Sequence, residues 1–243
     1  MSILSTFSKS IKDYFKNPIL IAPPIMLIIL ASLLSYLSVF VNYKISNALA
    51  VTSWFVFFSA VYLLLVSFFF SGIIGMTKEI FDKKKTSLKS FWFYSKKFFL
   101  KNFVVVLVFL IAYNLVSFTA YYGALYLGKA LALSSTYAQI LFTAIYFLGL
   151  LLVIFLTFSN FYLILFNFQI FTSIKKSIIF VKKRYLSTLS IVLIFFIIIT
   201  LLERFVSKII FNIALSELIN LFITYPILLL VLTRFLLTEE KQK

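Results

Sequence analysis

Residues 102–128 read NFVVVLVFLIAYNLVSFTAYYGALYLG, and no charged side chain occurs among them. A helix needs about 20 predominantly apolar residues to cross the hydrocarbon core of a bilayer, so this segment is long enough. Ordinary soluble domains rarely contain such a stretch, because roughly a quarter of their residues are charged. The segment therefore predicts a transmembrane helix, and it decides the class of the protein.

The rest of the chain repeats this composition. Hydrophobic residues make up 63% of the 243 positions, charged residues make up 12%, and the mean hydropathy is +1.11. We predict an all-α polytopic membrane protein with six transmembrane helices, at residues 19–41, 50–75, 102–128, 137–166, 186–202 and 216–237. Because these helices and short loops use almost the whole sequence, we expect a single membrane domain over residues 1–243.

A repeated unit organises the six spans. Residues 86–89 (TSLK) match residues 172–175 (TSIK), and the same shift of 86 places Lys96-Lys97 on Lys182-Lys183 and Phe109 on Phe195. A fainter first copy starts at Ser2 and places Lys16-Asn17 on Lys101-Asn102. Self-similarity at a fixed spacing indicates a repeated structural unit. We predict three hairpin repeats, at about residues 1–85, 86–171 and 172–243.

Each repeat begins with a Lys-rich segment in which apolar residues recur at spacings of three and four. This pattern predicts an amphipathic helix, and Ser87 and Ser173 are predicted N-caps. We expect a basic amphipathic interfacial helix before each hairpin, on the cytoplasmic side, with its lysines towards anionic headgroups. The predicted lipid contacts are Lys9, Lys12, Lys89, Lys96, Lys97, Lys175, Lys182 and Lys183. Such helices either brace the bundle or act as a sensor of anionic lipid.

The formal charge of +16 is distributed unevenly. With a cytoplasmic N-terminus, 19 of the 23 basic residues fall on the cytoplasmic side, and four remain outside: Lys44, Lys129, Arg204 and Lys208. This is the positive-inside bias of membrane proteins. It predicts a multi-pass protein of the cell (cytoplasmic) membrane with both termini cytoplasmic. Because topology accounts for the charge, we expect no nucleic-acid partner.

Polar residues are few within the predicted spans. The repeats are parallel, so three hairpins could surround a pseudo-threefold centre. Asn114, Asn160 and Asn220 are the candidate intramembrane polar positions for a substrate path, and interhelical hydrogen bonding is the alternative role. Pro226 interrupts the sixth span; neighbouring groups could absorb the carbonyl it frees, or that carbonyl could coordinate a cation.

Side chains that carry chemistry are scarce. The chain contains no cysteine and no histidine, and no phosphate-binding Gly-rich loop, nucleophile elbow or metal-ligand cluster occurs in it. Glu79 and Asp82 are followed at once by three lysines, which predicts ion pairing rather than metal binding. We expect no catalytic, cofactor-binding or metal-binding residue, no cofactor and no enzymatic activity.

Three short segments carry a resemblance: residues 72–79 (GIIGMTKE), 86–92 (TSLKSFW) and 173–183 (SIKKSIIFVKK). They resemble a family of uncharacterised archaeal six-span integral membrane proteins. They are also distantly similar to the membrane domain of bacterial glycerophosphodiester phosphodiesterases, whose catalytic domain has no counterpart here. The resemblance implies a six-span membrane domain and carries over no activity.

These observations favour a non-enzymatic integral membrane protein, acting as a scaffold or accessory subunit of a membrane complex with a membrane-protein partner. The alternatives are a small permease or channel, or a lipid-handling protein, built on the pseudo-threefold six-helix centre. A permease predicts that Asn114, Asn160 and Asn220 face one cavity. A scaffold predicts that they meet neighbouring backbones or a second chain, and lipid handling predicts a lateral opening between spans, lined by lysines at its inner edge.

Overall fold

The computed structural model of the chain describes residues 3–44, 48–130, 135–210 and 218–241, which form helices and no strand. The elements are α1 (Ile3–Lys16), η1 (Pro18–Ile21), α2 (Ala22–Lys44), α3 (Ala48–Lys83), α4 (Leu88–Ala130), α5 (Ser135–Val153), η2 (Ile154–Leu156), α6 (Ser159–Leu165), α7 (Ile170–Lys183), α8 (Tyr185–Ile210), η3 (Asn220–Thr224) and α10 (Tyr225–Lys241). Of the short elements, η1 and η2 are 3-10 helices and η3 is a π-helix.

The prediction of six apolar spans is confirmed. Six helical stretches are long and apolar enough to cross a bilayer, in agreement with a multi-pass membrane protein: Pro18–Val41, Val51–Lys83, Leu88–Lys129, Gln139–Leu165, Tyr185–Arg204 and Asn220–Lys241. Two of these helices extend well beyond the predicted spans. The 43 residues of α4 correspond to a length of about 65 Å, twice the hydrocarbon thickness of a bilayer. The basic first part of α4 is therefore a continuation of the span and not a separate helix.

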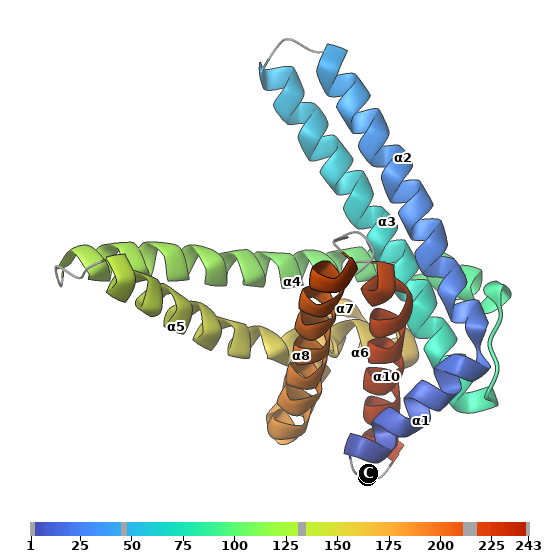
Figure 1. Cartoon of the computed structure of the whole chain (residues 1–243). Coiled ribbons are helices and arrows are strands. Elements are labelled where there is room, and N and C mark those ends of the chain that lie inside the picture. The colour runs from blue at the N-terminus through green and yellow to red at the C-terminus, as the bar shows by residue number, and fades with distance from the viewer. Residues whose placement is uncertain (1–2, 45–47, 131–134, 211–217, 242–243) are drawn as a thin grey trace.

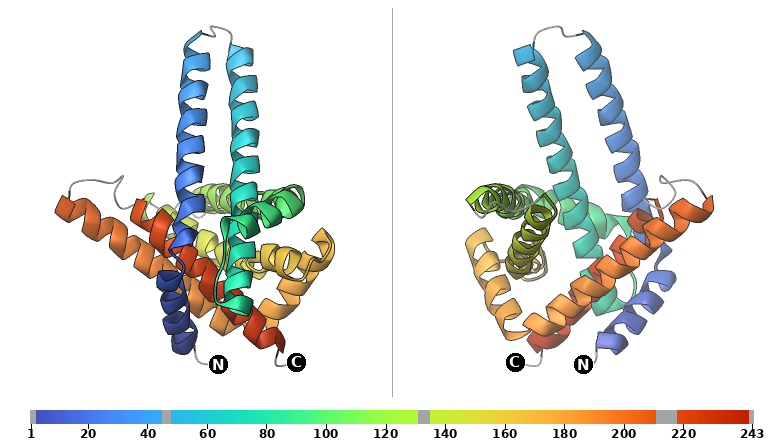
Figure 2. Two further views of the ribbon diagram at one scale, coloured as in Figure 1. Left: turned by 90° about the vertical axis from the view of Figure 1, so that its right-hand side faces the viewer. Right: turned by 60° about the vertical axis from the view of Figure 1, so that its left-hand side comes forward.

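The spans form three hairpins that leave a common base in different directions (Figures 1 and 2). The hairpins consist of α2 with α3, of α4 with α5, and of α8 with η3 and α10. The two ends of the chain lie near each other at the base (Figure 2). The far end of each hairpin points away from the base, so the hairpins share contacts only where they meet.

The hydrophobic core lies at this meeting point. Phe158, Phe180 and Phe235 bring α6, α7 and α10 together through mutual ring contacts, and all three side chains are buried. A second cluster joins Tyr14 of α1 to Phe91 of α4 and to residues of η1, α3 and α10. The last span, which contains α10, is the only one of the six that is mostly buried inside the protein. It is the central element of the base.

The helices α1 and α7 pack against the base with small polar residues as well as with large ones, namely Tyr14 of α1 and Phe180 and Val181 of α7. Thr6 and Ser10 are buried on α1, and Ser173 and Ser177 are buried on α7. Large apolar side chains on the other faces stay exposed, among them Leu4, Phe15 and Phe171. Small residues allow close approach of two helices, which explains why they face the protein.

One of the two predicted N-caps is correct. The Ser87 hydroxyl accepts a hydrogen bond from the backbone N–H of Ser90 at the start of α4 (3.3 Å). The prediction for Ser173 is wrong, because α7 begins one turn earlier, after Gln169. Ser173 instead donates its hydroxyl to the backbone carbonyl of Gln169 (2.9 Å). The start of α7 was misplaced because the TSIK match sets the repeat register, whereas the helix start depends on the turn that precedes it.

The prolines act locally. Pro23 and Pro24 lie in the first turn of α2, where a missing backbone N–H costs no hydrogen bond. Pro226 follows the π-helix η3 and removes the hydrogen bond that would otherwise reach the carbonyl of Phe222. The hydroxyl of Tyr14 from α1 donates to this carbonyl (2.7 Å). The Tyr14 side chain thus provides the hydrogen-bond donor that Pro226 cannot provide.

Candidate functional site: an apolar cavity where the hairpins meet

A cavity of about 670 Å³ lies where the three hairpins meet. Its volume falls within the range of roughly 300–1,000 Å³ that ligand sites occupy. Every one of the six spans contributes to its wall. The main contributors are Pro24 and Leu27 from the first span, Val66, Phe69, Phe70 and Ile73 from the second, Val106, Phe109 and Leu110 from the third, Leu156, Thr157, Asn160 and Phe161 from the fourth, Val192, Phe195, Phe196 and Ile199 from the fifth, and Leu221, Tyr225, Pro226, Leu228, Leu229 and Leu232 from the sixth.

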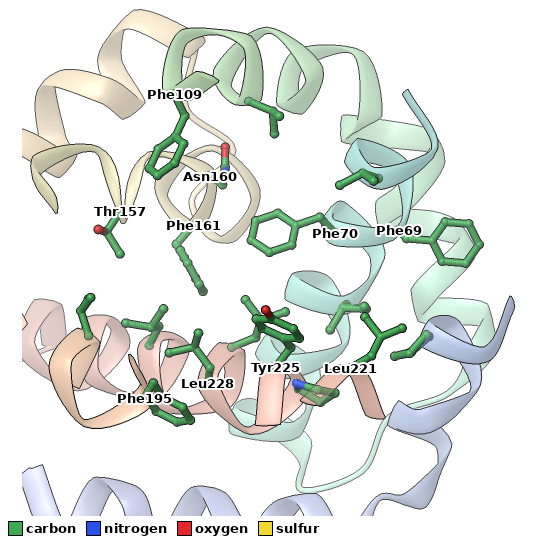
Figure 3. A pocket seen from close by; sticks show the side chains of 18 of the residues that line it. Phe69, Phe70, Phe109, Thr157, Asn160, Phe161, Phe195, Leu221, Tyr225 and Leu228 are labelled. Atoms are coloured by element: carbon green, nitrogen blue, oxygen red, sulfur yellow. The ribbon is translucent and has the colours of Figure 1, made fainter. Parts of the chain in front are cut away.

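The wall of the cavity is aromatic and aliphatic. Among the described residues that line it, only Thr157, Asn160 and Tyr225 carry a polar side-chain group, and none is charged. Thr157 and Asn160 lie on one side of the space, and Tyr225 lies on the other (Figure 3). Water gains little in such a space, whereas an apolar molecule that enters it loses unfavourable contact with water. The cavity suits an apolar ligand with few polar groups.

The cavity is accessible from the surface of the protein. Phe196 and Tyr225 line it and yet expose 65% and 43% of their surface, and Phe109 exposes 38%. These three residues belong to α8, α10 and α4, so the accessible part of the wall lies between hairpins. A molecule that lies beside the spans can reach the cavity sideways.

The polar side of the cavity belongs to an interrupted helix. The fourth span changes from α5 to the 3-10 helix η2 at Ile154 and becomes helical again at Ser159. Ser177 of α7 satisfies the backbone at this break, since its hydroxyl donates to the carbonyl of Phe155 (2.7 Å) and accepts from the N–H of Phe158 (3.1 Å). Irregular backbone at membrane depth is tolerated only where protein buries it or where it lines a cavity. The second condition holds here, because Leu156 and Thr157 line the cavity.

Asn160 follows directly after this break. Its carboxamide oxygen is buried and has no hydrogen-bond partner within the protein. A buried acceptor without a partner costs about 1–3 kcal/mol, so its presence in a cavity wall requires an explanation.

The opposite side of the cavity is also irregular. The π-helix η3 contributes Leu221, and Tyr225 follows it directly. Asn220, at the start of η3, is buried and donates its amide to the Glu203 carboxylate of α8 (3.4 Å). Single-turn π-helical segments occur frequently at functional sites.

The structure does not bring the three predicted asparagines together. Asn160 lines the cavity, and Asn220 is buried beside it without lining it. Asn114 is exposed on α4 and donates its amide to the carbonyl of Leu110, one turn earlier in the same helix (2.8 Å). The three side chains therefore do not form one polar path.

The eight lysines predicted to contact lipid are all exposed: Lys9, Lys12, Lys89, Lys96, Lys97, Lys175, Lys182 and Lys183. None of them lines the cavity, so its described wall lacks the lysines that were expected at the inner edge of a lipid-handling opening. The ammonium group of Lys97 lies over the rings of Phe93 and Phe98, at 5.7 and 5.1 Å from their centroids. Of the two carboxylates predicted to form ion pairs, Glu79 binds Lys83 one helical turn away (3.0 Å) and also accepts hydrogen bonds from Thr86 and Ser90.

Sequence reasoning missed most of this site. The break at residues 154–158 contains neither proline nor glycine, so no helix-breaking residue marks it. One signal could have found part of the wall: Phe109 and Phe195 occupy matching positions in the second and third predicted repeats, and both line the cavity. Apolar residues are so common in this chain that such a match gains meaning only beside the fold.

Residues that could hold a metal ion do not cluster. In the part of the chain that the structure describes, no three acidic side chains come together as metal ligands would.

A family model described as a domain of unknown function, DUF7847, matches residues 1–238. No curated protein matches the chain, and no solved structure matches it either. These comparisons provide no link to the glycerophosphodiester phosphodiesterases or to an archaeal source.

Proposed function

We propose that this chain, which belongs to the DUF7847 family, holds a lipid or lipid-like molecule in the cavity between its hairpins. The description of the family assigns no activity, so the proposal is argued from the geometry of the protein. In this proposal the protein is non-enzymatic and uses no cofactor. It is a multi-pass protein of the cytoplasmic membrane with both termini in the cytoplasm.

The observation that carries the proposal is the wall of the cavity. All six spans contribute to it, and its described lining contains no charged side chain and only three polar ones. Lipid tails surround the spans of a membrane protein, so an accessible apolar cavity at membrane depth is offered acyl chains before any other ligand. A hydrophilic solute would find few partners on this wall, which gives a permease or channel for such solutes less support.

The repeat adds a second argument. Pro24, Phe109 and Phe195 all line the cavity, and they are 85 and 86 residues apart, which is the spacing of the three copies. Val106 and Val192 also line it at the same spacing. Equivalent residues of three repeats that reach one space support a pseudo-threefold arrangement of the hairpins, with the cavity near its centre.

The amphipathic segments support the placement in the membrane. Leu4 of α1 and Phe171 of α7 expose 80% and 85% of their surface, as expected of side chains that enter the acyl boundary. The exposed lysines of the same segments are free to face anionic headgroups of the cytoplasmic leaflet, each worth about 1 kcal/mol of attraction. We propose that α1 and α7 lie in this interface, and that the start of α4, which continues the third span, reaches it.

A scaffold is the second candidate, and Asn114 favours it. Its carboxamide is exposed on α4 near the middle of the third span, where lipid tails offer it no hydrogen bond. A membrane-protein partner with a polar group at the same depth would satisfy it. In this candidate function the α4–α5 hairpin is the binding surface.

Filling the cavity tests the proposal. We expect the substitution V106W to place an indole in the cavity and to remove most of the lipid that copurifies with the protein from mild detergent. The matched control is V104W, two residues away on the same helix, where the side chain is 40% exposed and lies outside the cavity wall. The measurement is lipid and protein mass spectrometry on the same eluate.

The outcomes separate the two functions. Loss of a stoichiometric lipid in V106W and its retention in V104W support lipid binding in the cavity. Equal lipid content in the unaltered protein and both variants contradicts it. A stoichiometric protein partner that disappears on the substitution N114L would instead favour the scaffold.

A further inference from the structure

We infer that a second copy of this chain covers the exposed face of α4 around Asn114, so that two copies pair through their α4–α5 hairpins. This inference goes beyond the proposed lipid binding and holds whether or not the cavity is occupied. It names the partner that the scaffold candidate leaves open. It rests on the carboxamide of Asn114, on the spacing of the side chains around it, and on the face of α4 that they occupy.

The carboxamide of Asn114 is exposed and mostly unused. A carboxamide can donate two hydrogen bonds and accept two, and Asn114 uses one amide N–H for the carbonyl of Leu110 (2.8 Å). Within the part of the chain that the structure describes, its oxygen and its second N–H have no other partner. The residue lies near the middle of the apolar segment 102–128, where the bilayer core offers no water to bind. A protein partner at this depth would satisfy the carboxamide.

A second copy of the chain matches this carboxamide in both chemistry and depth. Because a carboxamide carries donors and an acceptor, two of them can exchange N–H···O hydrogen bonds across a twofold axis. Two copies that insert with the same orientation place their Asn114 side chains at the same depth, since the residue is the same in both. Hydrogen bonds between polar side chains of neighbouring helices hold helices together in membranes. A different protein would need a polar group at this depth by coincidence.

Large exposed side chains surround Asn114 in the pattern of a helix–helix seam. Alternating spacings of three and four residues along α4 define this seam: Ile111, Asn114, Phe118, Tyr121 and Leu125. All five residues are exposed, and the four large side chains expose 40–61% of their surface. The same spacing occurs where two parallel helices pair along their length, and a single polar residue in such a seam fixes the register of the pair.

The seam lies on the side of α4 that its own hairpin leaves free. The helix α5 packs against the side of α4 that carries Val116 and Gly123, which lie next to Gly149 and Ile145 of α5. Between them, Ala120 is fully buried. With about 3.6 residues per helical turn, the seam points to the opposite side of α4. The hairpin extends away from the other two (Figure 1), so α4 of a second copy can lie along the seam without displacing α5.

Cysteine cross-linking tests the seam directly, because the chain contains no cysteine of its own. In the full-length protein in liposomes, we expect L125C to form a disulfide-linked dimer on mild oxidation. The matched control is Y126C, which is more exposed than Leu125 (69% against 40%) but points about 100° away from the seam. We expect Y126C to stay mostly monomeric, although random collisions would favour the more exposed position.

The role of the asparagine is tested by the dimer fraction of fluorescently labelled protein in liposomes, counted from single-molecule photobleaching steps over a range of protein-to-lipid ratios. We expect N114L to weaken dimerisation roughly three- to thirtyfold, which is the strength of interhelical hydrogen bonds in membranes. The variant N114Q keeps a carboxamide and should retain most of the dimer. T143V is the matched control, because it removes an exposed polar group of α5 whose hydroxyl already donates to the carbonyl of Gln139 (2.9 Å).

Three outcomes overturn the inference. A monomer at every protein density leaves the seam to lipid. A dimer that N114L does not weaken, or that cross-links through Y126C as readily as through L125C, has its interface elsewhere. A different protein that binds at Asn114, while the chain itself stays monomeric, is the partner of the scaffold in place of a second copy. Because the cross-linking variants keep Asn114, their result stands even where N114L lowers stability, and lipid binding in the cavity is judged separately with V106W.

Discussion

At the scale of single residues, two glycines fix how closely α3 and α4 cross. A Cβ atom at Gly75 would overlap the ring of Tyr94, and one at Gly72 would overlap Phe91 and the Ser95 hydroxyl. The same crossing is held by Asn102, whose buried amide donates to the carbonyl of Ser67 (3.0 Å). These glycines belong to the segment GIIGMTKE at residues 72–79, which therefore has a packing role at the crossing of α3 and α4.

We expect the substitution G75A to lower the free energy of unfolding by about 1–3 kcal/mol, the usual cost of overpacking a close contact. The matched control is G123A on α4, because the added methyl group would meet Ile145 of α5 at an ordinary contact distance of 3.4 Å. That change should be neutral or stabilising by up to about 1 kcal/mol, since alanine favours a helix over glycine. Thermal unfolding in detergent, followed by light scattering and fluorescence, measures both. Equal stability of G75A and G123A would contradict the close crossing.

At the scale of elements, the sixth span contains both a helix-breaking residue, Pro226, and a change in helix type, the π-helix η3. Pro226 predicts a disturbed helix, and the disturbance is the π-helix η3 immediately before it. The partner of the freed carbonyl of Phe222 is Tyr14, more than 200 residues away in the chain. No local pattern could have named that partner, because the contact depends on how α1 packs against the sixth span.

We expect the substitution Y14F to lower the free energy of unfolding by about 1 kcal/mol, and by at most about 3 kcal/mol, because it removes the side-chain donor from the partly buried Phe222 carbonyl. The matched control is Y36F on α2, where the side chain is 72% exposed. The same unfolding measurement applies to both variants. If Y14F and Y36F behave alike, the hydrogen bond from α1 does not stabilise the interruption before Pro226.

The sequence predicts features that depend on local composition, and it misses features that depend on contacts between segments far apart in the chain. Hydrophobic runs predict all six spans, because span length depends on the thickness of the bilayer and not on the neighbouring helices. The break at residues 154–158 escapes prediction because Ser177, from another helix, stabilises it. Asn160 was singled out as a polar residue in an apolar span, but the cavity that it lines arises only when all six spans meet.

At the scale of the whole molecule, the basic residues separate along the hairpins. Lys44 is the last residue of α2, Lys129 lies at the end of α4, and Arg204 and Lys208 lie towards the end of α8. The remaining positions that the structure describes lie at or near the base, where α1, α7 and the two chain ends meet (Figure 2). This arrangement matches the charge asymmetry from which cytoplasmic termini were predicted, and it makes the orientation testable at single positions.

The absence of cysteine from the chain allows each position to be labelled alone. We expect a membrane-impermeant maleimide to label the variant K129C in intact cells, because the far end of the α4–α5 hairpin should face the outside. The variants K9C and K241C, at the exposed surface of the base, should be labelled only after the membrane is permeabilised. Full labelling of all three variants under denaturing conditions is the control for reactivity.

Labelling of K9C or K241C in intact cells, with K129C protected, would reverse the orientation. The lysines of the base would then face the outer leaflet, and the proposed contact of α1 and α7 with anionic cytoplasmic lipid would have to be abandoned, whereas the cavity between the hairpins would remain accessible to lipid tails in either orientation.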